Sequence, residues 1–264
     1  VMQRGEVSAV YVVDEDGRIR CAFCESEIIN HHSIYEVIRI YNRKGAFVTA
    51  HLCRMERSAV LIGISMPKTE TIFKAMNVLI ENSNIENGNI EIVINSNQNW
   101  SIRFIPHTYP TNEQYRNGVA TMLYNALREN PNAKVKRINL RQATADFIEQ
   151  KGIYEVLYVH NNQLSEGSRS NIFFIKNKQL YTPPISAVLP GITREAVIDI
   201  AQAHTISVHE TEISTTELPQ FDAAFLTGTS PEILPVSSID NLHFDVNERT
   251  MRFLMKQFSQ ITSE

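Results

Sequence analysis

The sequence predicts an α+β protein, with strands and helices mixed along the chain, built from two domains. Short runs of alternating apolar residues are separated by turn residues, and longer segments repeat apolar residues at helical spacing. The composition of the chain changes at residues 106–117, where prolines, asparagines and other polar residues lie between two such regions. The length of 264 residues suffices for two modest domains. We therefore predict domains at residues 1–109 and 118–264, joined by a linker at 110–117.

The first domain is predicted to open with a hairpin and to continue with strands and two helices. Asp14-Glu15-Asp16-Gly17 supplies turn chemistry between strands at 9–13 and 18–23. Apolar residues recur at helical spacing from Thr49 or Ala50 onward, which predicts a helix there. The other predicted elements are strands at 33–41, 46–48, 90–94 and 100–105, and a helix at 68–81.

The second domain is predicted to begin at Gly118 and to contain three helices among its strands. Gly152 suits the position just beyond a helix end, because glycine adopts the left-handed conformation without strain. Asn161-Asn162 suits a turn between two strands. The predicted strands lie at 119–123, 135–138, 154–160, 171–175, 179–182 and 223–226, and the helices at 141–151, 192–204 and 250–260.

Composition excludes several functional classes. A net charge of −4 does not indicate the excess of basic residues that nucleic-acid-binding proteins usually have. No apolar run approaches the roughly 20 residues that a membrane-spanning helix needs. The first residues carry no apolar signal region, so we expect a cytoplasmic protein. Three cysteines argue against a disulfide framework. Cys21 and Cys24 have the spacing of a redox or half-zinc site, but no second such pair accompanies them, and we expect no metal.

Lys136 and Glu166 are the two residue types that a pyridoxal-phosphate site needs, and they lie 30 residues apart (166 − 136). The lysine can carry the cofactor as a Schiff base, and the acid can hold the pyridine nitrogen protonated. A lone lysine is more often a solvated charge, and Glu166 alone would fit an exposed hairpin end. Lys134 would also share a face with Lys136 in a strand, so the pattern alone does not choose between the two lysines.

Two glycine-containing segments resemble phosphate-binding segments. Gly191-Ile192-Thr193 precedes a predicted helix, where free N–H groups and a hydroxyl would meet an anion at the positive helix end. Simple helix capping would have the same sequence. Thr229-Ser230 follows a buried strand, where an ordinary turn is the alternative.

Strand alternation places Tyr35, Val37 and Arg39 on one face of the predicted strand 33–41, and Glu36 and Ile38 on the other. Arg39 suits a substrate carboxylate and Tyr35 can donate a hydrogen bond. An exposed arginine on a half-buried strand is the alternative.

These segments together resemble the fold-type IV pyridoxal-phosphate enzymes, the group of branched-chain and D-amino-acid aminotransferases and aminodeoxychorismate lyase. The resemblance runs from about residue 33 to 240. The segments that carry it are Lys136-Arg137-Ile138-Asn139-Leu140, Ser165-Glu166-Gly167-Ser168-Arg169-Ser170-Asn171, Pro190-Gly191-Ile192-Thr193-Arg194, Thr227-Gly228-Thr229-Ser230-Pro231-Glu232 and His51-Leu52-Cys53-Arg54.

The resemblance implies a role for each matched residue. Lys136 would form the Schiff base and Glu166 would bind the pyridine nitrogen of the cofactor, while Leu189 would pack on the ring. The residues that would bind the cofactor phosphate are Arg54, Gly191, Ile192, Thr193, Thr229 and Ser230. Arg57 is the alternative to Arg54 for this role, and it would otherwise be a solvated surface arginine. The substrate pocket would contain Tyr35, Arg39 and His107. In the D-amino-acid enzymes, an arginine in the segment that corresponds to residues 104–110 binds the substrate carboxylate. This chain has no arginine in that segment.

The resemblance also implies a small N-terminal α/β sandwich, a larger C-terminal domain with a barrel-like sheet, a cofactor between them, and a homodimer. The implied activity is an aminotransferase that exchanges an amino group between an amino acid or amine and a 2-oxo acid. The alternatives are a lyase of the aminodeoxychorismate type and a catalytically weak cofactor-binding homologue. His31-His32-Ser33 stands where the family usually has Gly-Asp-Gly, which motivates the last alternative.

Overall fold

A computed structural model describes residues 11–13, 19–21, 33–97 and 99–263. Contacts group them into two units: the smaller runs to Thr108 and includes Ala133–Arg137, and the larger comprises Tyr109–Asn132 and the chain from Ile138 onward. The predicted division into independent domains remains a proposal. Cys24 and His31-His32 lie outside the described residues, as do the predicted hairpin turn at 14–17 and the ends of the predicted first hairpin.

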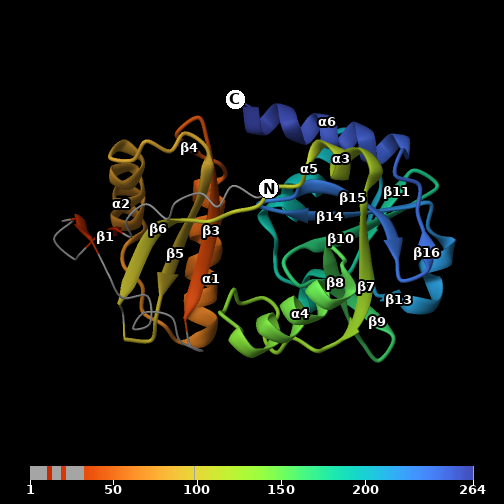
Figure 1. The fold of residues 1–264 in the computed structure, drawn as a ribbon, viewed down its shortest axis with the longest axis horizontal. Helices are drawn as coiled ribbons and strands as arrows, with labels where there is room; N and C mark the ends of the chain where they lie inside the picture. The colour runs from red at the N-terminus through yellow and green to blue at the C-terminus, as the bar shows by residue number, and fades with distance from the viewer. Residues whose placement is uncertain (1–10, 14–18, 22–32, 98, 264) are drawn as a thin grey trace. The chain divides into compact units, whose positions relative to one another are not determined.

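The smaller unit contains a four-stranded antiparallel sheet with two helices (Figure 1). Its order is β4-β3-β5-β6, and a separate antiparallel pair, β1 (Tyr11–Val13) with β2 (Ile19–Cys21), supplies the inner part of the predicted hairpin. The bounds are β3 Ile34–Tyr41, β4 Lys44–Gly45, β5 Gly88–Ile94, β6 Trp100–Ile105, α1 Val48–Ile62 and α2 Thr69–Glu81.

The two faces of this sheet differ in character. Along β3, buried residues alternate with half-buried ones, as the sequence predicts. The buried face packs against α1 and α2 through Ile38, Ile90, Ile102 and their neighbours. The opposite face carries cross-strand rows in which Tyr35 pairs with Val93, and Val37 with Glu91. Tyr35 and Glu91 therefore lie on the face that the helices do not cover.

Two predicted strands are wrong. Residues 46–48 do not form a strand, because Phe47 adopts a left-handed conformation (φ 53°, ψ 32°) and α1 begins at Val48. Residues 135–138 form no ladder either: Val135 makes an isolated bridge to Ile34, and α4 (Ile138–Lys151) begins three residues before the predicted helix start at 141.

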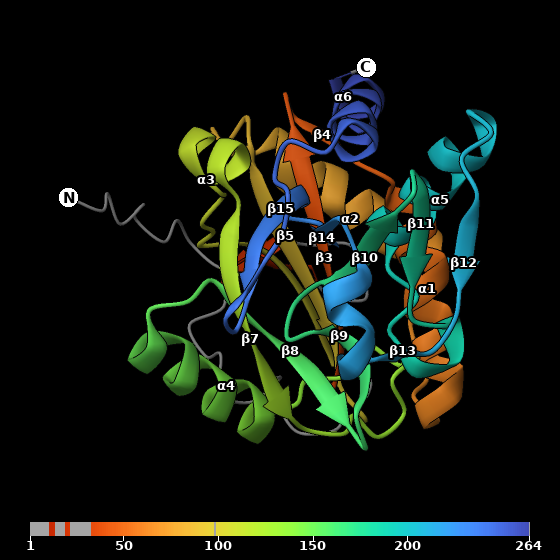
Figure 2. The same cartoon turned by 90° about the vertical axis from the view of Figure 1, so that its right-hand side faces the viewer.

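The larger unit contains a ten-stranded mixed sheet that is strongly curved (Figure 2), in agreement with the predicted barrel-like sheet. Its order is β12-β11-β10-β14-β15-β7-β8-β9-β13, with β16 beside β15. The central β7 runs parallel to both its neighbours, whereas β8–β9, β10–β14 and β14–β15 are antiparallel.

The bounds of the larger unit's elements follow chain order. The strands are β7 Val119–Asn125, β8 Glu155–His160, β9 Gln163–Gly167, β10 Asn171–Lys176, β11 Gln179–Thr182, β12 Val208–Glu210, β13 Ile213–Ser214, β14 Ala223–Gly228, β15 Glu232–Ile239 and β16 Leu242–His243. The helices are α3 Asn112–Asn117, α4, α5 Ile192–Ala203 and α6 Arg249–Ser263, with 3₁₀ turns at Ile185–Ala187 and Thr215–Gln220.

The hairpin of β8 and β9 places Glu166. Asn161 and Asn162 both have positive φ, 49° and 62°, which suits the two central residues of a tight hairpin turn. Leu157 pairs with Gly167 across this hairpin, so Glu166 lies near the end of β9. Among the described residues, no helix combines the length and the apolar character needed to cross a membrane.

Candidate active site

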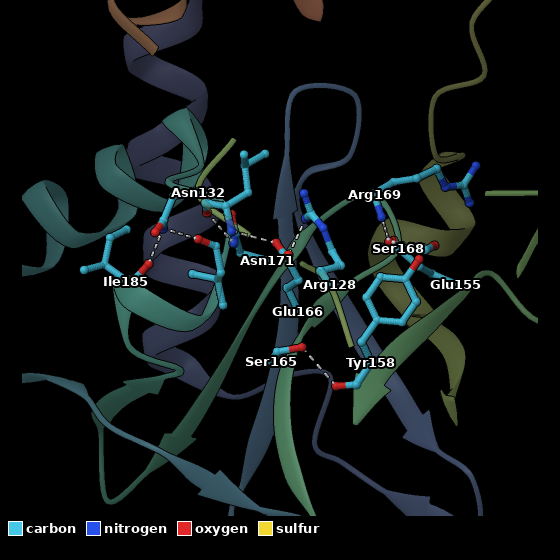
Figure 3. Close-up of polar contacts among 12 residues, drawn as sticks. Arg128, Asn132, Glu155, Tyr158, Ser165, Glu166, Ser168, Arg169, Asn171 and Ile185 are labelled. Atoms are coloured by element: carbon cyan, nitrogen blue, oxygen red, sulfur yellow. Dashed lines mark hydrogen bonds and ion pairs between the residues drawn. The ribbon is translucent and has the colours of Figure 1, made fainter. Parts of the chain in front are cut away.

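Glu166 is buried, and both oxygens of its carboxylate have partners within the larger unit (Figure 3). Oε1 forms an ion pair with Nη1 of Arg128, and Oε2 accepts a hydrogen bond from the main-chain N–H of Leu189 at 3.0 Å. Two residues that the sequence predicts as cofactor ligands, Glu166 and Leu189, are therefore in direct contact. Arg128 was not predicted.

The segment around Leu189 is fixed by two asparagine side chains, shown in Figure 3. Nδ2 of Asn171 donates to the carbonyl of Leu189 at 3.0 Å, and Nδ2 of Asn132 donates to the carbonyls of Ile185 and Val188 at 2.7 and 2.9 Å. A Cβ on Gly191 would collide with Oδ1 of Asn171, so glycine is required there for this packing.

The N-terminus of α5 has the properties of an anion site. Gly191 is the N-cap residue, and among the described residues it provides no side-chain hydrogen bond to the start of the helix. The first N–H groups of a helix, here from Ile192 and Thr193, have no acceptor within the helix. Both residues are buried. On β14, which packs near α5, the buried hydroxyl of Thr227 has no hydrogen-bond partner.

Thr229 and Ser230 lie half-buried in the turn between β14 and β15. The carbonyl oxygen of Arg169 lies 3.5 Å from the point where a Cβ on Gly228 would be. The turn that carries Thr229 and Ser230 therefore begins beside the loop that follows Glu166.

A second buried carboxylate, Glu155, organises that loop. It accepts hydrogen bonds from Oγ of Ser168 at 3.3 Å and Oγ of Ser170 at 3.0 Å, and from the main-chain N–H of Arg169. Burial raises the pKa of Glu155 above its usual value, although Arg169 and the two serines act in the opposite direction. A Cβ on Gly167 would lie 2.6 Å from Glu155 Oε1, which leaves room for glycine alone beside Glu166.

Lys136 is buried in the smaller unit and is held to β3 by its main chain. Its N–H donates to the carbonyl of Ser33 at 2.9 Å, and the N–H of Tyr35 donates to the carbonyl of Lys134 at 3.1 Å. Nζ of Lys136 lies 4.7 Å from the centre of the Tyr35 ring, and Nζ of Lys134 lies 4.9 Å from it. The structure thus brings Lys136 and Tyr35 together, and the amino group of Lys134 lies near the same ring.

Nζ of Lys136 also forms an ion pair with Oε1 of Glu91 on β5. The other carboxylate oxygen accepts from Nη2 of Arg103 on β6 at 2.9 Å. Burial would raise the pKa of Glu91, but Lys136 and Arg103 outweigh it, and the pKa is lowered. Glu91 is therefore ionised at neutral pH.

Arg54 lies buried on the helix-covered side of the sheet and pairs with Glu36. Nε and Nη2 of Arg54 donate to the two carboxylate oxygens at 2.7 Å each, and Nδ1 of His51 lies 2.8 Å from Oε2. Burial would raise the pKa of Glu36, but Arg54 and His51 hold it well below its usual range; burial also lowers the pKa of His51.

Three further residues considered in the sequence analysis belong to the smaller unit. The Arg39 guanidinium carbon lies 4.7 Å from the centre of the Tyr41 ring, and Arg39 is half-buried on the same sheet face as Tyr35. His107 is exposed, with Nδ1 3.4 Å from the carbonyl of Ile105, and Arg57 is exposed on α1.

Two charged residues of these sites were missed by sequence reasoning. Glu91 carried a signal, because it is an ionisable residue inside the apolar strand of Ile90, Ile92, Val93 and Ile94, where an unpaired charge would be costly. Arg128 carried none: it lies in a polar segment 38 residues before Glu166, and only the folded chain brings the two together.

Comparisons with known proteins identify relatives of this chain. The chain is 27% identical over 225 residues to a D-alanine aminotransferase from Bacillus licheniformis, a match that covers 78% of each chain. A branched-chain aminotransferase from Thermoproteus uzoniensis, solved with norvaline, is 25% identical, with a TM-score of 0.84 over 97% of this chain and 96% of that one. A Legionella pneumophila protein assigned as a 4-amino-4-deoxychorismate lyase is 26% identical, with a TM-score of 0.80 over 88% of this chain and 91% of that one.

The family described as amino-transferase class IV matches residues 33–239. That range contains the buried lysine, the paired glutamate and the uncapped start of α5. The chain belongs to the class IV aminotransferase family of enzymes.

Proposed function

We propose that this chain is a pyridoxal 5′-phosphate-dependent aminotransferase that moves an amino group between an amino acid or amine and a 2-oxo acid. Lys136 would link the cofactor covalently. The observation that carries the proposal is the buried Glu166 carboxylate, held by Arg128 and by the N–H of Leu189 next to the start of α5. A pyridinium nitrogen and a phosphate are the two ends of this cofactor, and the larger unit offers a group suited to each.

The residues of the larger unit fit the cofactor chemically. An ionised carboxylate at Glu166 would keep the pyridine nitrogen protonated, and bound pyridoxal phosphate would then supply an electron sink for the carbanion formed at the substrate. The uncapped N–H groups of Ile192 and Thr193, next to Gly191, suit the phosphate. The unpaired hydroxyl of Thr227 is a further donor near this helix end.

We assign the other predicted residues as follows. Arg54, Thr229 and Ser230 would also bind the phosphate, and Leu189 would pack against the ring. Tyr35, Arg39 and His107 would face the substrate, with the Arg39 guanidinium suited to a carboxylate. Lys136, once its amine is free, would move a proton at the substrate carbon that bears the amino group.

A donor and acceptor panel tests this function. Purified protein with pyridoxal phosphate, an amino donor and a 2-oxo acid is expected to form the new amino acid with ping-pong kinetics, since each half-reaction releases its product before the next substrate binds. Lys136→Ala is expected to be inactive, and Lys134→Ala to be active. Activity that survives loss of Lys136 but not of Lys134 would move the assignment to Lys134.

A second candidate is a lyase that eliminates a β or γ group from the same carbanion. The similarity to a Legionella pneumophila protein assigned as a 4-amino-4-deoxychorismate lyase favours it. The two reactions differ in their need for an acceptor. Release of pyruvate without any 2-oxo acid would identify the lyase, and cofactor binding without either reaction would identify a catalytically weak homologue.

We also propose that the protein is a cytoplasmic homodimer that binds small molecules rather than nucleic acid. The net charge of −4 supports the absence of polyanion binding. Size-exclusion chromatography with light scattering tests the dimer, which should have about twice the chain mass of 30.1 kDa.

A further inference from the structure

Glu91 is a buried carboxylate to which neither the predicted chemistry nor the family assignment gives a role. It lies on β5 among Ile90, Ile92 and Val93, and its side chain is on the sheet face opposite the two helices. Burying a carboxylate costs free energy unless it is paired. Two cations contact it and compensate its charge.

Those two cations come from different elements. Arg103 is the direct cross-strand neighbour of Glu91 on β6, and its Nη2 lies 2.9 Å from Oε2. Lys136 approaches Oε1 from the segment that is bound to the start of β3. Arg103 is thus a fixed partner within the sheet, whereas the long side chain of Lys136 is attached to a segment outside it.

We propose that Glu91 is a positioning residue for Lys136: its carboxylate keeps the Lys136 amino group in an ion pair beside Tyr35 and so restrains the reaction of this lysine with carbonyl compounds. An ammonium nitrogen has no lone pair, so Lys136 must give a proton to solvent and leave Glu91 before its nitrogen can form a bond to carbon. The importance of this restraint for catalysis rests on the proposed function.

Arg103 makes the restraint reversible. Breaking a buried ion pair is costly when it leaves one charge without a partner. When Lys136 withdraws, Glu91 keeps the guanidinium of Arg103, so its charge remains compensated. Glu91 can therefore hold the lysine and also release it without unfolding the sheet.

The reactivity of Lys136 toward an acylating reagent tests the proposal, and it does not depend on cofactor chemistry. The full-length protein is dialysed against hydroxylamine to remove carbonyl compounds and pulsed with acetic anhydride, and acetylation of each lysine is quantified by mass spectrometry. Lys134 is the internal reference, because it lies on the same Tyr35 ring. Glu91→Gln is expected to raise the ratio of Lys136 to Lys134 acetylation about tenfold. An unchanged or lower ratio would overturn the proposal.

Two further variants keep the test valid if Glu91→Gln folds poorly. Glu91→Asp keeps the charge but shortens the side chain, so it should raise the ratio by less than Glu91→Gln. Arg103→Gln leaves the contact between Lys136 and Glu91 and should not raise the ratio. Thermal unfolding establishes that each variant is folded. A rise with Arg103→Gln that equals the rise with Glu91→Gln would mean that loss of local packing, and not loss of the ion pair, exposes the lysine.

Borohydride trapping of pyridoxal phosphate on Lys136 separates this inference from the proposed function. If the function is wrong, no cofactor is trapped on Lys136 in any variant, although the acetylation ratio still responds to Glu91→Gln. If the inference is wrong, wild type traps the cofactor and the ratio does not respond. If both hold, Glu91→Gln traps the cofactor faster than wild type.

Discussion

Arg128 and Glu166 form an ion pair in the larger unit, and the main-chain N–H of Leu189 holds the second oxygen of the same carboxylate. Both oxygens of a buried acid are thereby oriented by groups on different segments of the chain. The arrangement fixes the direction of the Glu166 carboxylate, as the proposed contact with a protonated ring nitrogen would require.

The first prediction concerns that ion pair. Arg128→Met should destabilise the protein by about 3 kcal/mol, because it leaves the Glu166 carboxylate buried without its cation. Urea unfolding of the two proteins measures the difference. Arg249→Met, on the exposed start of α6, is the matched control and should change the stability little. Equal effects of the two substitutions would show that Arg128 contributes no more than a surface arginine.

Glu166→Gln tests the charge itself, because it changes the side chain at nearly constant volume. We expect the transamination rate constant to fall by about a hundredfold or more, since stabilisation of developing charge is commonly worth that much. Cofactor affinity should fall much less, because the phosphate contacts remain. Glu195→Gln, at an exposed position of α5, serves as the control. A variant with normal kcat would remove Glu166 from the proposed mechanism.

Gly191→Ala should weaken binding of pyridoxal phosphate about tenfold, because the new methyl group collides with Asn171 and displaces the start of α5. Pyridoxal, which lacks the phosphate, provides a control within the same pair of proteins. Its affinity should be almost the same in wild type and variant. A parallel loss of affinity for both compounds would mean that α5 does not serve the phosphate.

The pH dependence of stability should report the buried cluster of Glu36, His51 and Arg54. The pKa of Glu36 is lowered from its ordinary value of 4.5, so its stabilising contribution is complete above 4.5 and is lost as the pH falls toward the lowered pKa. We therefore expect the stability difference between wild type and Glu36→Gln to shrink as the pH is lowered from 7 to below 4.5. Urea titrations of both proteins across this range measure it.

Glu70→Gln, at an exposed position of α2 in the same unit, is the control for that titration. The stability of this variant should equal that of wild type at every pH. A constant difference between wild type and Glu36→Gln across the range would mean that Glu36 titrates alike in the folded and unfolded chain, contrary to its pairing with Arg54.

Elements with a clear periodic pattern could be predicted from the sequence, and those defined by tertiary contacts could not. The sequence predicts β3 because isoleucine, valine and tyrosine, which favour strands, fill most of its eight positions. β9, Gln163–Gly167, was missed because Leu164 is its only large apolar residue, and its strand conformation comes from pairing with β8 and β13. Residues 46–48 look like a strand by composition, but Phe47 adopts a left-handed conformation before α1.

The candidate site divides in the same way. Resemblance identified single residues such as Lys136 and Glu166, and the structure shows both to be buried. Their pairing with Glu91 and Arg128 could not be predicted, because these partners lie 45 and 38 residues away in sequence. Pairing over such separations depends on strand order and register, which no local pattern in the sequence encodes.

The most direct test of the account is covalent capture of the cofactor. Wild type, Lys136→Ala and Lys134→Ala are incubated with pyridoxal phosphate and reduced with borohydride, and the labelled peptide is identified by mass spectrometry alongside the absorbance spectrum. The account predicts one cofactor fixed on Lys136 in wild type and in Lys134→Ala, and none in Lys136→Ala. A wild-type protein that captures no cofactor, or captures it on another lysine, would contradict it.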